Sequence, residues 1–314
     1  MTVPIPFTVV GGFLGSGKTT LVNHLLRHAG GERITVLVND FGDVAIDADL
    51  IEAHDGDTIT LANGCICCSI GGELAGAIPT VLAARPRPDR ILVEASGIAE
   101  PRRIAAYGTL PGLRPDGTLV LADAETVVAR CADDRIGHQV RAQLAQADLI
   151  VLTKVDLLDD DEVAARRAWL AATFPGIGVV EARAGVVAPE ALLGSGVGLD
   201  GSGPGAVPGD APGDGAPHGF ATCTFEAHDP IPRDELEAWL GALPPAVLRA
   251  KGLVRTVEAS EVATIVQRVG ARTRLTAGGP WTDPAVPGRI VLIAAEGELG
   301  EVTAPAPWHR RELR

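Results

Sequence analysis

A glycine-rich segment near the start of the chain has the residue types and spacing of a phosphate-binding loop. Residues 12–19 read GFLGSGKT and match the pattern G-x-x-x-x-G-K-[ST]. An apolar run precedes them and a helical pattern follows, so backbone N–H groups and a helix N-terminus would surround an anion. The alternative is a tight glycine turn before a helix. The nucleotide-binding residues predicted here are Gly12, Gly15, Ser16, Gly17, Lys18 and Thr19.

In this pattern the lysine and the threonine have separate tasks. Lys18 reaches the β- and γ-phosphates of a nucleoside triphosphate, and the Thr19 hydroxyl binds Mg²⁺. A second oxygen ligand is predicted at Glu94, which ends the apolar run at residues 90–94. Gly97 follows it and would let the backbone approach the γ-phosphate. A surface carboxylate at a strand end is the alternative for Glu94.

Base selection is predicted at residues 152–156 (LTKVD), where another apolar run ends. An aspartate carboxylate accepts hydrogen bonds from the N1–H and the exocyclic amine of guanine, whereas adenine offers no such donor pair. Asp156 therefore favours GTP over ATP, and the stem of Lys154 is expected to lie along the base. The motif usually begins with Asn and here begins with Thr153, so we expect a weaker or different contact at that position, which would affect affinity more than selectivity. A strand that ends in an ordinary turn is the alternative.

Three of the five cysteines, Cys65, Cys67 and Cys68, lie within four positions. Thiolates favour Zn²⁺ and other late or soft metals. Three neighbouring ligands leave an open coordination position, as in a site that exchanges its metal. A labile disulfide and buried packing thiols are the alternatives. Further candidate ligands are His54, Asp57 and Glu73, and the two cysteines expected to be structural are Cys131 and Cys223.

Residues 39–47 (NDFGDVAID) lie between the phosphate-loop helix and the cysteines. In a P-loop GTPase this position is a switch that the γ-phosphate and Mg²⁺ order. Asp40 and Asp43 are expected to position water or metal, and a polar loop is the alternative. No glutamine is evident in the water-positioning role, so intrinsic hydrolysis is expected to be slow.

The elements that position these residues follow from short apolar runs that alternate with helical patterns. The runs lie at residues 7–10, 34–38, 90–94, 118–121 and 149–152. Fully apolar strands separated by helices predict a parallel sheet covered on both faces. The predicted fold class is therefore α/β, a doubly wound P-loop nucleoside-triphosphatase with a mostly parallel sheet. Residues 46–51 and 58–61 could form a hairpin beside it.

Residues 194–218 divide the chain. They are rich in Gly, Pro and Asp and contain no aromatic residue, Lys or Arg, so they are predicted to be a disordered linker. They separate a nucleotide-binding domain at residues 1–193 from a second domain at residues 219–314. The second domain is predicted to be a smaller α+β domain. Its expected strands lie at residues 220–225, 253–257 and 290–293, and its expected helix at residues 233–243.

The composition indicates which classes of partner and which cellular location to expect. The formal net charge is −13, and phosphate contacts need a positive surface, so no nucleic-acid partner is expected. No apolar run has the length of a transmembrane helix, and the N-terminus lacks the regions of a signal peptide, so we expect a cytoplasmic protein without a membrane partner. Only Lys18, Lys154 and Lys251 are lysines among 27 basic residues. Each is expected to mark a place that needs a compact ammonium, with chance as the alternative.

The motifs GGFLGSGKTT, NDFGDVAID, NGCICC, ILVEASGIAEP and LTKVDL, in that order, resemble those of the CobW-like GTPases. These are P-loop metallochaperones with a Cys-x-Cys-Cys metal site. Residues 248–253 (LRAKGL) resemble part of their C-terminal domain, so the resemblance covers the chain outside the linker. It implies that Mg²⁺–GTP orders the switch, that the switch arranges the thiolates for metal, and that hydrolysis releases the metal to a client protein.

The resemblance also implies roles for single residues. It adds Thr20 to the phosphate loop and makes Lys18, Asp43 and Glu94 the catalytic set. Metal ligands are implied at the three neighbouring cysteines, with Thr19 and Glu94 for Mg²⁺. The family's switch usually has Glu where this chain has Asp43, and the shorter carboxylate is expected to weaken switch closure. Many members have a His-rich stretch near the domain junction, and this chain has only His218 there.

Together these observations predict a GTP-hydrolysing metal chaperone that loads Zn²⁺ or Co²⁺ and delivers it to a client metalloprotein, as a monomer or weak dimer. Thiolate ligands favour Zn²⁺ over Co²⁺. One alternative is a P-loop kinase acting on a small metabolite, against which LTKVD argues. Another is a metal sensor whose nucleotide is only a structural ligand. The C-terminal domain is expected, by family analogy, to recognise the partner.

Overall fold

The computed structural model describes residues 3–39, 58–61, 70–193, 220–295, 299 and 302–310. The chain divides into two compact units, one of residues 1–175 with 179–189 and one of residues 176–178 with 190–314. Within the described ranges, no helix combines the length and the apolar character needed to cross a membrane. The expectations that lie outside the described residues concern Asp40, Asp43, His54, Asp57, Cys65, Cys67, Cys68, residues 46–51 and residues 194–218.

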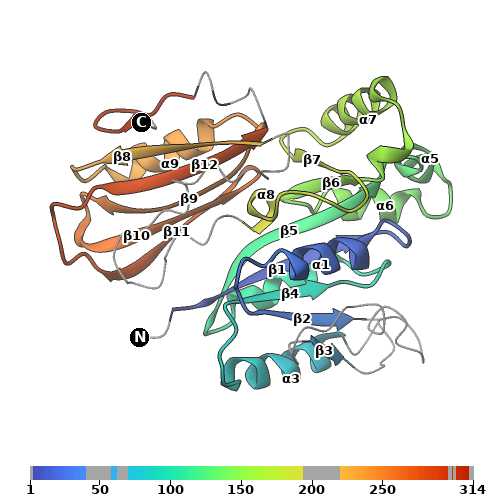
Figure 1. Cartoon of the computed structure of the whole chain (residues 1–314), viewed down its shortest axis with the longest axis horizontal. Coiled ribbons are helices and arrows are strands. Elements are labelled where there is room, and N and C mark those ends of the chain that lie inside the picture. Colours follow the sequence, from blue (N-terminus) through green and yellow to red (C-terminus); the bar gives the residue numbers. More distant parts are fainter. Residues whose placement is uncertain are drawn as a thin grey trace. The chain divides into compact units, whose positions relative to one another are not determined.

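The first unit is built on a seven-stranded sheet with the strand order β3-β2-β4-β1-β5-β6-β7 (Figure 1). Its strands are β1 (Ile5–Gly12), β2 (Ile34–Asn39), β3 (Thr58–Leu61), β4 (Arg90–Glu94), β5 (Leu113–Asp123), β6 (Leu149–Thr153) and β7 (Gly178–Ala182). The neighbouring pairs from β3 to β6 are parallel. The predicted doubly wound α/β fold is confirmed. β3 joins the sheet as a parallel edge strand beside β2.

Helices cover the sheet because its strands are apolar on both faces. They are α1 (Lys18–Arg27), α3 (Ile70–Ala83), α4 (Pro101–Ala105), α5 (Val127–Ala132), α6 (Gly137–Leu144) and α7 (Asp160–Thr173), with 3-10 turns η1 (Ala106–Thr109) and η2 (Val155–Leu157). Ile5, Phe7 and Val9 of β1 point to one face and form a buried cluster with residues of α3 and α4. α1 packs against β1 and β4 but contributes nothing to that cluster, so it covers the other face.

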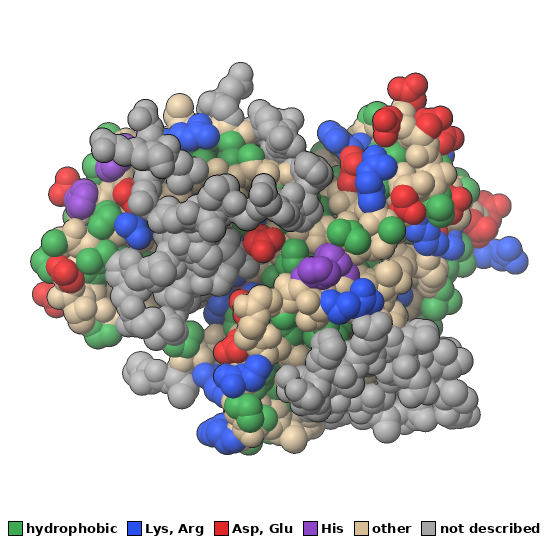
Figure 2. Space-filling view, viewed as in Figure 1, with side chains coloured by type: hydrophobic (Ala, Val, Ile, Leu, Met, Phe, Trp, Pro, Cys, Tyr) green, Lys and Arg blue, Asp and Glu red, His purple; other side chains and the backbone are tan. Residues whose placement is uncertain are grey.

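α7 shows how local sequence sets a helix start. Asp159 Oδ1 accepts a hydrogen bond from the Glu162 N–H at 2.8 Å, and Glu162 Oε2 accepts one from the Asp159 N–H at 3.2 Å. This capping box satisfies two N–H groups that the helix itself cannot pair. Acidic side chains gather over α7 in Figure 2, where they complement the positive end of the helix dipole.

The register of the parallel strands brings several polar residues to one edge of the sheet. Val10 of β1 and Val38 of β2 both pair with Glu94 of β4, and Asp123 of β5 pairs with Thr153 of β6. Because the carboxyl ends of parallel strands meet at the same edge, the loop after β1 lies beside these side chains.

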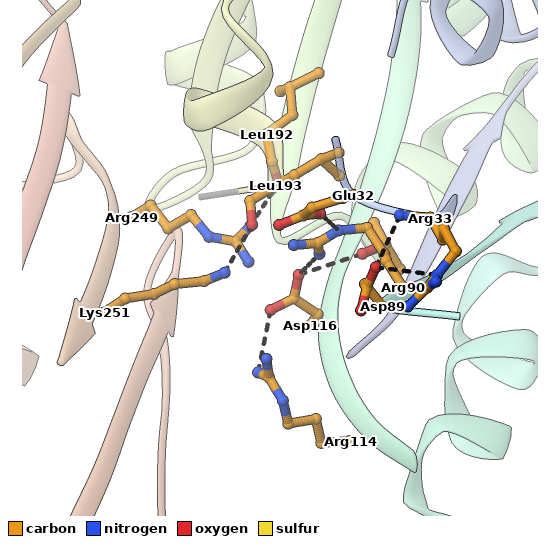
Figure 3. A network of polar contacts seen from close by, with 11 residues as sticks. Glu32, Arg33, Asp89, Arg90, Arg114, Asp116, Leu192, Leu193, Arg249 and Lys251 are labelled. Atoms are coloured by element: carbon orange, nitrogen blue, oxygen red, sulfur yellow. Dashed lines mark hydrogen bonds and ion pairs between the residues drawn. The ribbon is translucent and has the colours of Figure 1, made fainter. Parts of the chain in front are cut away.

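A buried ionic network lies at the opposite end of β4 (Figure 3). Arg90, which is 2% exposed, pairs through Nη1 with Asp116 and through Nε with Glu32 Oε2 at 3.1 Å. Asp116 also accepts a hydrogen bond from Thr8 Oγ1 at 3.4 Å and lies 3.6 Å from Arg114 Nη1. The buried Arg90–Asp116 pair therefore joins β4 to β5, and the Thr8 hydroxyl joins β1 to them.

The second unit has a six-stranded antiparallel sheet with the order β11-β10-β9-β12-β8-β13. Its elements are β8 (Phe220–Ala227), α9 (Arg233–Ala242), β9 (Val247–Thr256), β10 (Ala259–Val269), β11 (Arg272–Pro280), β12 (Gly288–Ala295) and β13 (His309–Arg310). Leu236, Trp239 and Leu240 of α9 pack on one face of this sheet against Phe225 and Ile290. The predicted α+β class is confirmed, and the hairpin of β10 and β11 was not predicted.

Two buried cations of β9 bind the end of α8 (Pro189–Leu193), whose last residues belong to the second unit. Arg249 Nη1 donates to Leu192 O, and Lys251 Nζ donates to Leu193 O at 2.7 Å (Figure 3). The last carbonyl groups of a helix have no partner within it, so these side chains satisfy them.

Removing Asp116 should strongly destabilise the first unit. In Asp116→Ala the Arg90 guanidinium stays buried and loses a carboxylate, so the free energy of unfolding should fall by about 3–5 kcal/mol. Urea denaturation followed by circular dichroism measures this loss. As a control, Glu100→Ala breaks an exposed pair with Arg103 and should cost less than about 1 kcal/mol. Equal, small losses in both variants would show that the buried network adds nothing to stability.

Candidate functional site

Residues 12–17 form a turn between β1 and α1 that requires glycine. Gly12, Gly15 and Gly17 have φ angles of 139°, 74° and 91°, which residues with a side chain rarely adopt. At Gly12 a Cβ atom would also lie 2.7 Å from the carbonyl oxygen of Leu121. The loop therefore has no side chains at the positions where its backbone N–H groups would contact an anion.

Lys18 places its ammonium group within this loop. The side chain is buried, and Nζ donates to Gly12 O at 3.1 Å and to Phe13 O at 3.4 Å. A compact cation beside bare backbone N–H groups is the arrangement that balances the charge of a polyphosphate.

The structure joins the two predicted magnesium ligands directly. Thr19 Oγ1 donates to Glu94 Oε1 at 2.9 Å, and Glu94 is 2% exposed. The Ala95 N–H donates to Val10 O at 2.9 Å, which extends the pairing of β1 and β4 past Glu94 and fixes the carboxylate beside α1. A hydroxyl and a carboxylate oxygen are the hard ligands that Mg²⁺ prefers, so this pair fits the ion.

Gly97 lies against the phosphate loop. A Cβ atom at Gly97 would lie 2.4 Å from Leu14 Cδ2 and 2.9 Å from the Leu14 backbone nitrogen. Only glycine allows the two segments to approach this closely.

Arg130 of α5 contacts the loop from outside and was not predicted. Its Nη1 donates to Leu14 O at 2.8 Å, and its guanidinium carbon lies 5.4 Å from the centre of the Phe13 ring. A hydrogen bond and a cation–π contact therefore fix the tip of the loop. Nothing in the sequence separates this arginine from the others, since it lies in no motif.

Thr153, at the first position of TKVD, contacts the phosphate loop. It is 3% exposed, and its hydroxyl lies 2.8 Å from Ser16 O and 3.2 Å from Ala122 O. The side chain therefore links the end of β6 to the phosphate loop.

Lys154 is held by an acid that the sequence did not indicate. Its backbone has a φ of 59°, and its Nζ lies 2.8 Å from Asp123 Oδ2. Asp123 is 4% exposed at the end of β5, and its other oxygen accepts a hydrogen bond from the Glu125 N–H. A buried carboxylate thus sets the direction of the lysine stem.

The loop after β7 brings a further unpredicted segment to the site. Asp156 Oδ1 accepts a hydrogen bond from the Ala184 N–H at 2.6 Å, and Ala184 has a φ of 49°. A Cβ atom at Gly185 would lie 2.6 Å from Thr20 Cγ2. Asp156, Thr20 and residues 184–185 therefore meet. No strand was predicted at residues 178–182, so nothing in the sequence analysis indicated this segment.

The described residues contain no group of three or more His, Cys, Asp or Glu side chains that could hold a metal ion. Cys131 and Cys223 are buried free thiols, and burial raises the pKa of both, which agrees with the packing role expected for them. Glu73 belongs to α3, but its side chain is outside the description. The predicted thiolate site thus remains a prediction.

Removing the Thr153 hydroxyl should weaken nucleotide binding. In Thr153→Val the side chain keeps its shape, but Ser16 O and Ala122 O lose a donor, so the affinity for GDP should fall about fivefold, or about 1 kcal/mol. Thr153→Ser keeps the hydroxyl and should bind like the wild type. Isothermal titration calorimetry measures both variants. Wild-type affinity in Thr153→Val would show that the hydroxyl does not support the loop.

Comparison with known proteins shows the family. The family model of the CobW/HypB/UreG nucleotide-binding domain matches residues 6–180, and that of the cobalamin synthesis protein cobW C-terminal domain matches residues 220–304. The zinc chaperone CobW of Pseudomonas aeruginosa is 31% identical over an aligned length of 335 residues. The match spans 93% of this chain and 88% of that protein.

Two further matches have either a smaller coverage or a lower sequence identity. The zinc chaperone CobW of a Sinorhizobium species is 36% identical over 226 residues, and the match spans 62% of this chain and 64% of that protein. The crystal structure of Zn(II)-bound YjiA GTPase from E. coli is 21% identical, covers 94% of this chain and 95% of its own, and has a TM-score of 0.45. The two family models and the Pseudomonas relative show that this chain is a P-loop GTPase of the CobW/HypB/UreG family, with a CobW C-terminal domain.

Proposed function

We propose that GTP binds along the carboxyl edge of the first sheet and that its hydrolysis drives the transfer of a metal ion to a client protein. The observation that carries the proposal is the Thr19–Glu94 hydrogen bond, because it joins the phosphate loop to a buried acid. Mg²⁺ held there would neutralise charge on the β- and γ-phosphates. The residues proposed to bind nucleotide are Gly12, Gly15, Ser16, Gly17, Lys18, Thr19, Thr20, Gly97, Lys154 and Asp156.

Guanine recognition is proposed at Asp156. Its carboxylate would accept hydrogen bonds from the N1–H and the exocyclic amine, and adenine has no equivalent pair of donors. Oδ1 of Asp156 already accepts a hydrogen bond from the Ala184 N–H, and this bond fixes the orientation of the carboxylate. The Lys154 stem, whose end is held by Asp123, would lie along the base.

Hydrolysis would proceed by in-line attack of water on the γ-phosphorus. The new bond forms to the water oxygen, and the bond from the γ-phosphorus to the oxygen bridging it to the β-phosphate breaks, which yields GDP and inorganic phosphate. The Lys18 ammonium would stabilise the charge that develops on the phosphoryl oxygens. Asp43, which lies outside the described residues, is proposed to position the water.

The metal site is proposed at Cys65, Cys67 and Cys68. Two relatives are named zinc chaperones, and three thiolates favour Zn²⁺, with Co²⁺ as the second candidate. β3 ends at Leu61, four residues before Cys65. In the sheet β3 lies two strands from β4, the strand that ends at Glu94. Neighbouring strands are about 4.8 Å apart, so the end of β3 lies roughly 10 Å from the end of β4, where Glu94 stands.

That separation is short enough for the nucleotide to affect the thiolates. Leu61 pairs with Asn39, the last residue of β2, so both strands end at this edge of the sheet. We therefore propose that GTP and GDP give the thiolates different metal affinities, and that a client metalloprotein in the cytoplasm receives the ion. The protein would act as a monomer or weak dimer.

Changing Asp156 to asparagine should alter base selection. In Asp156→Asn the amide oxygen could still accept from the Ala184 N–H. The amide NH₂ would then face the N–H donors of guanine, and two donors cannot form a hydrogen bond with each other. The affinity for GTP should fall roughly 100-fold, and that for XTP should rise, because xanthine has an acceptor at that position. Competition with a fluorescent GDP measures both.

The control for this variant is Asp160→Asn, a neighbouring exposed acid at the start of α7. It should leave the order of nucleotide affinities unchanged. If Asp156→Asn still binds GTP like the wild type, the base does not lie at this aspartate.

Zinc affinity should depend on the nucleotide. In an anaerobic competition titration, a non-hydrolysable GTP analogue with Mg²⁺ should tighten Zn²⁺ binding more than tenfold relative to GDP or to no nucleotide, a coupling of about 1.4 kcal/mol. Cys67→Ser with Cys68→Ser should abolish the tight binding, whereas Cys131→Ala should keep it. Equal affinity in all three nucleotide states would contradict a gated chaperone cycle, and the same titration with Co²⁺ compares the two metals.

A further inference from the structure

Two glutamines of α6 hold three successive carbonyl groups after β4. Gln143 Nε2 donates to Gly97 O at 3.1 Å and to Ala99 O at 2.9 Å, and Gln139 Nε2 donates to Ile98 O at 2.8 Å. The glutamines are four residues apart, so they share one face of α6. Gln143 is 3% exposed, so its two hydrogen bonds are made out of water.

Gln143 fixes the peptide group after Gly97, and a turn fixes the one before it. The Ala99 N–H donates to Ser96 O at 3.0 Å, which closes a turn over residues 96–99. In a planar trans peptide the N–H points away from the carbonyl of the preceding residue. The Gly97 N–H therefore points away from the inside of this turn, and the carbonyl of Gly97 is turned to α6.

The other side of Gly97 meets the phosphate loop. A Cβ atom there would overlap Leu14, as described above. Gln143 also lines a small cavity behind that loop, together with Ser16 and Phe13. The Gln143 side chain thus contacts the Gly97 segment and borders the same small cavity as the phosphate loop.

We propose that Gln143, assisted by Gln139, is a positioning residue that holds the Gly97 backbone ready for the γ-phosphate and so sets the preference for GTP over GDP. The inference rests on the proposed GTP site. Of the two nucleotides, only GTP carries the γ-phosphate. A donor that is already oriented does not lose free energy to ordering when the phosphate arrives.

The test uses the full-length protein and Gln143→Met, which keeps the side-chain length and removes both amide donors. The affinity for GDP should stay within about twofold of the wild type, because GDP does not reach Gly97. The affinity for a non-hydrolysable GTP analogue should fall tenfold or more. In steady-state hydrolysis kcat should fall by a similar factor.

Two further variants make the test specific. Gln146→Met is the matched control, since Gln146 follows the same helix but accepts a hydrogen bond from the Arg102 N–H, beyond the turn. It should leave the ratio of GDP to GTP-analogue affinity unchanged. Gln139→Met changes a more exposed side chain and should shift that ratio in the same direction as Gln143→Met, by roughly threefold, even if Gln143→Met does not fold.

The outcomes separate this inference from the proposed function. If the wild type binds neither nucleotide, both are overturned. If the wild type binds GTP and the glutamine variants keep the wild-type affinity ratio, the nucleotide site stands and the positioning role is overturned. If the glutamine variants lose affinity for GDP and the GTP analogue equally, α6 has only a structural role, and the inference fails as well.

Discussion

A polyphosphate is bound by backbone N–H groups only where no side chain stands between them, and here the register of β1 creates that condition. Gly12 pairs with Leu121 of β5, whose carbonyl oxygen would overlap any side chain at Gly12. On the other side of β1, Val10 pairs with Glu94, which puts the acid beside Thr19. A shift of β1 by one residue would turn its side chains to the opposite face and separate these groups. The binding loop is therefore a consequence of strand pairing as well as of its own glycines.

The same three strands are joined at their other end by buried charge. Arg90 begins β4 and Glu94 ends it, and both are 2% exposed. The Arg90–Asp116 pair joins β4 to β5, and a hydrogen bond from Thr8 Oγ1 to Asp116 joins β1 to β5. A buried ion pair contributes little net stability compared with apolar packing, but it strongly disfavours arrangements in which one partner is left alone. We infer that this network opposes slippage of the strands that carry the phosphate loop and the magnesium ligands.

The sequence predicted what lies in contiguous motifs and missed what depends on distant contacts. The phosphate loop, Glu94 and LTKVD could be recognised because spacing alone defines them. Asp123, Arg130 and Gln143 could not, since each acts through a carbonyl or ammonium group far away in the chain. In the second unit β11 was missed because its sequence, RTRLTAGGP, contains no apolar run. β9 was predicted too short because the buried cations at its start resemble a surface segment.

Each of the three lysines makes a specific polar contact. Lys18 donates to carbonyl groups inside the phosphate loop, Lys154 pairs with buried Asp123, and Lys251 donates to Leu193 O at the end of α8. A planar guanidinium is wider than an ammonium and directs its donors in one plane, so it would need more room and a second acceptor beside the first. The fork fits at Arg90, which pairs with Asp116 and Glu32 at once, whereas Arg249 donates to one carbonyl group beside Lys251. The contacts therefore account for a paired guanidinium at Arg90, but at the end of α8 both cations perform the same task.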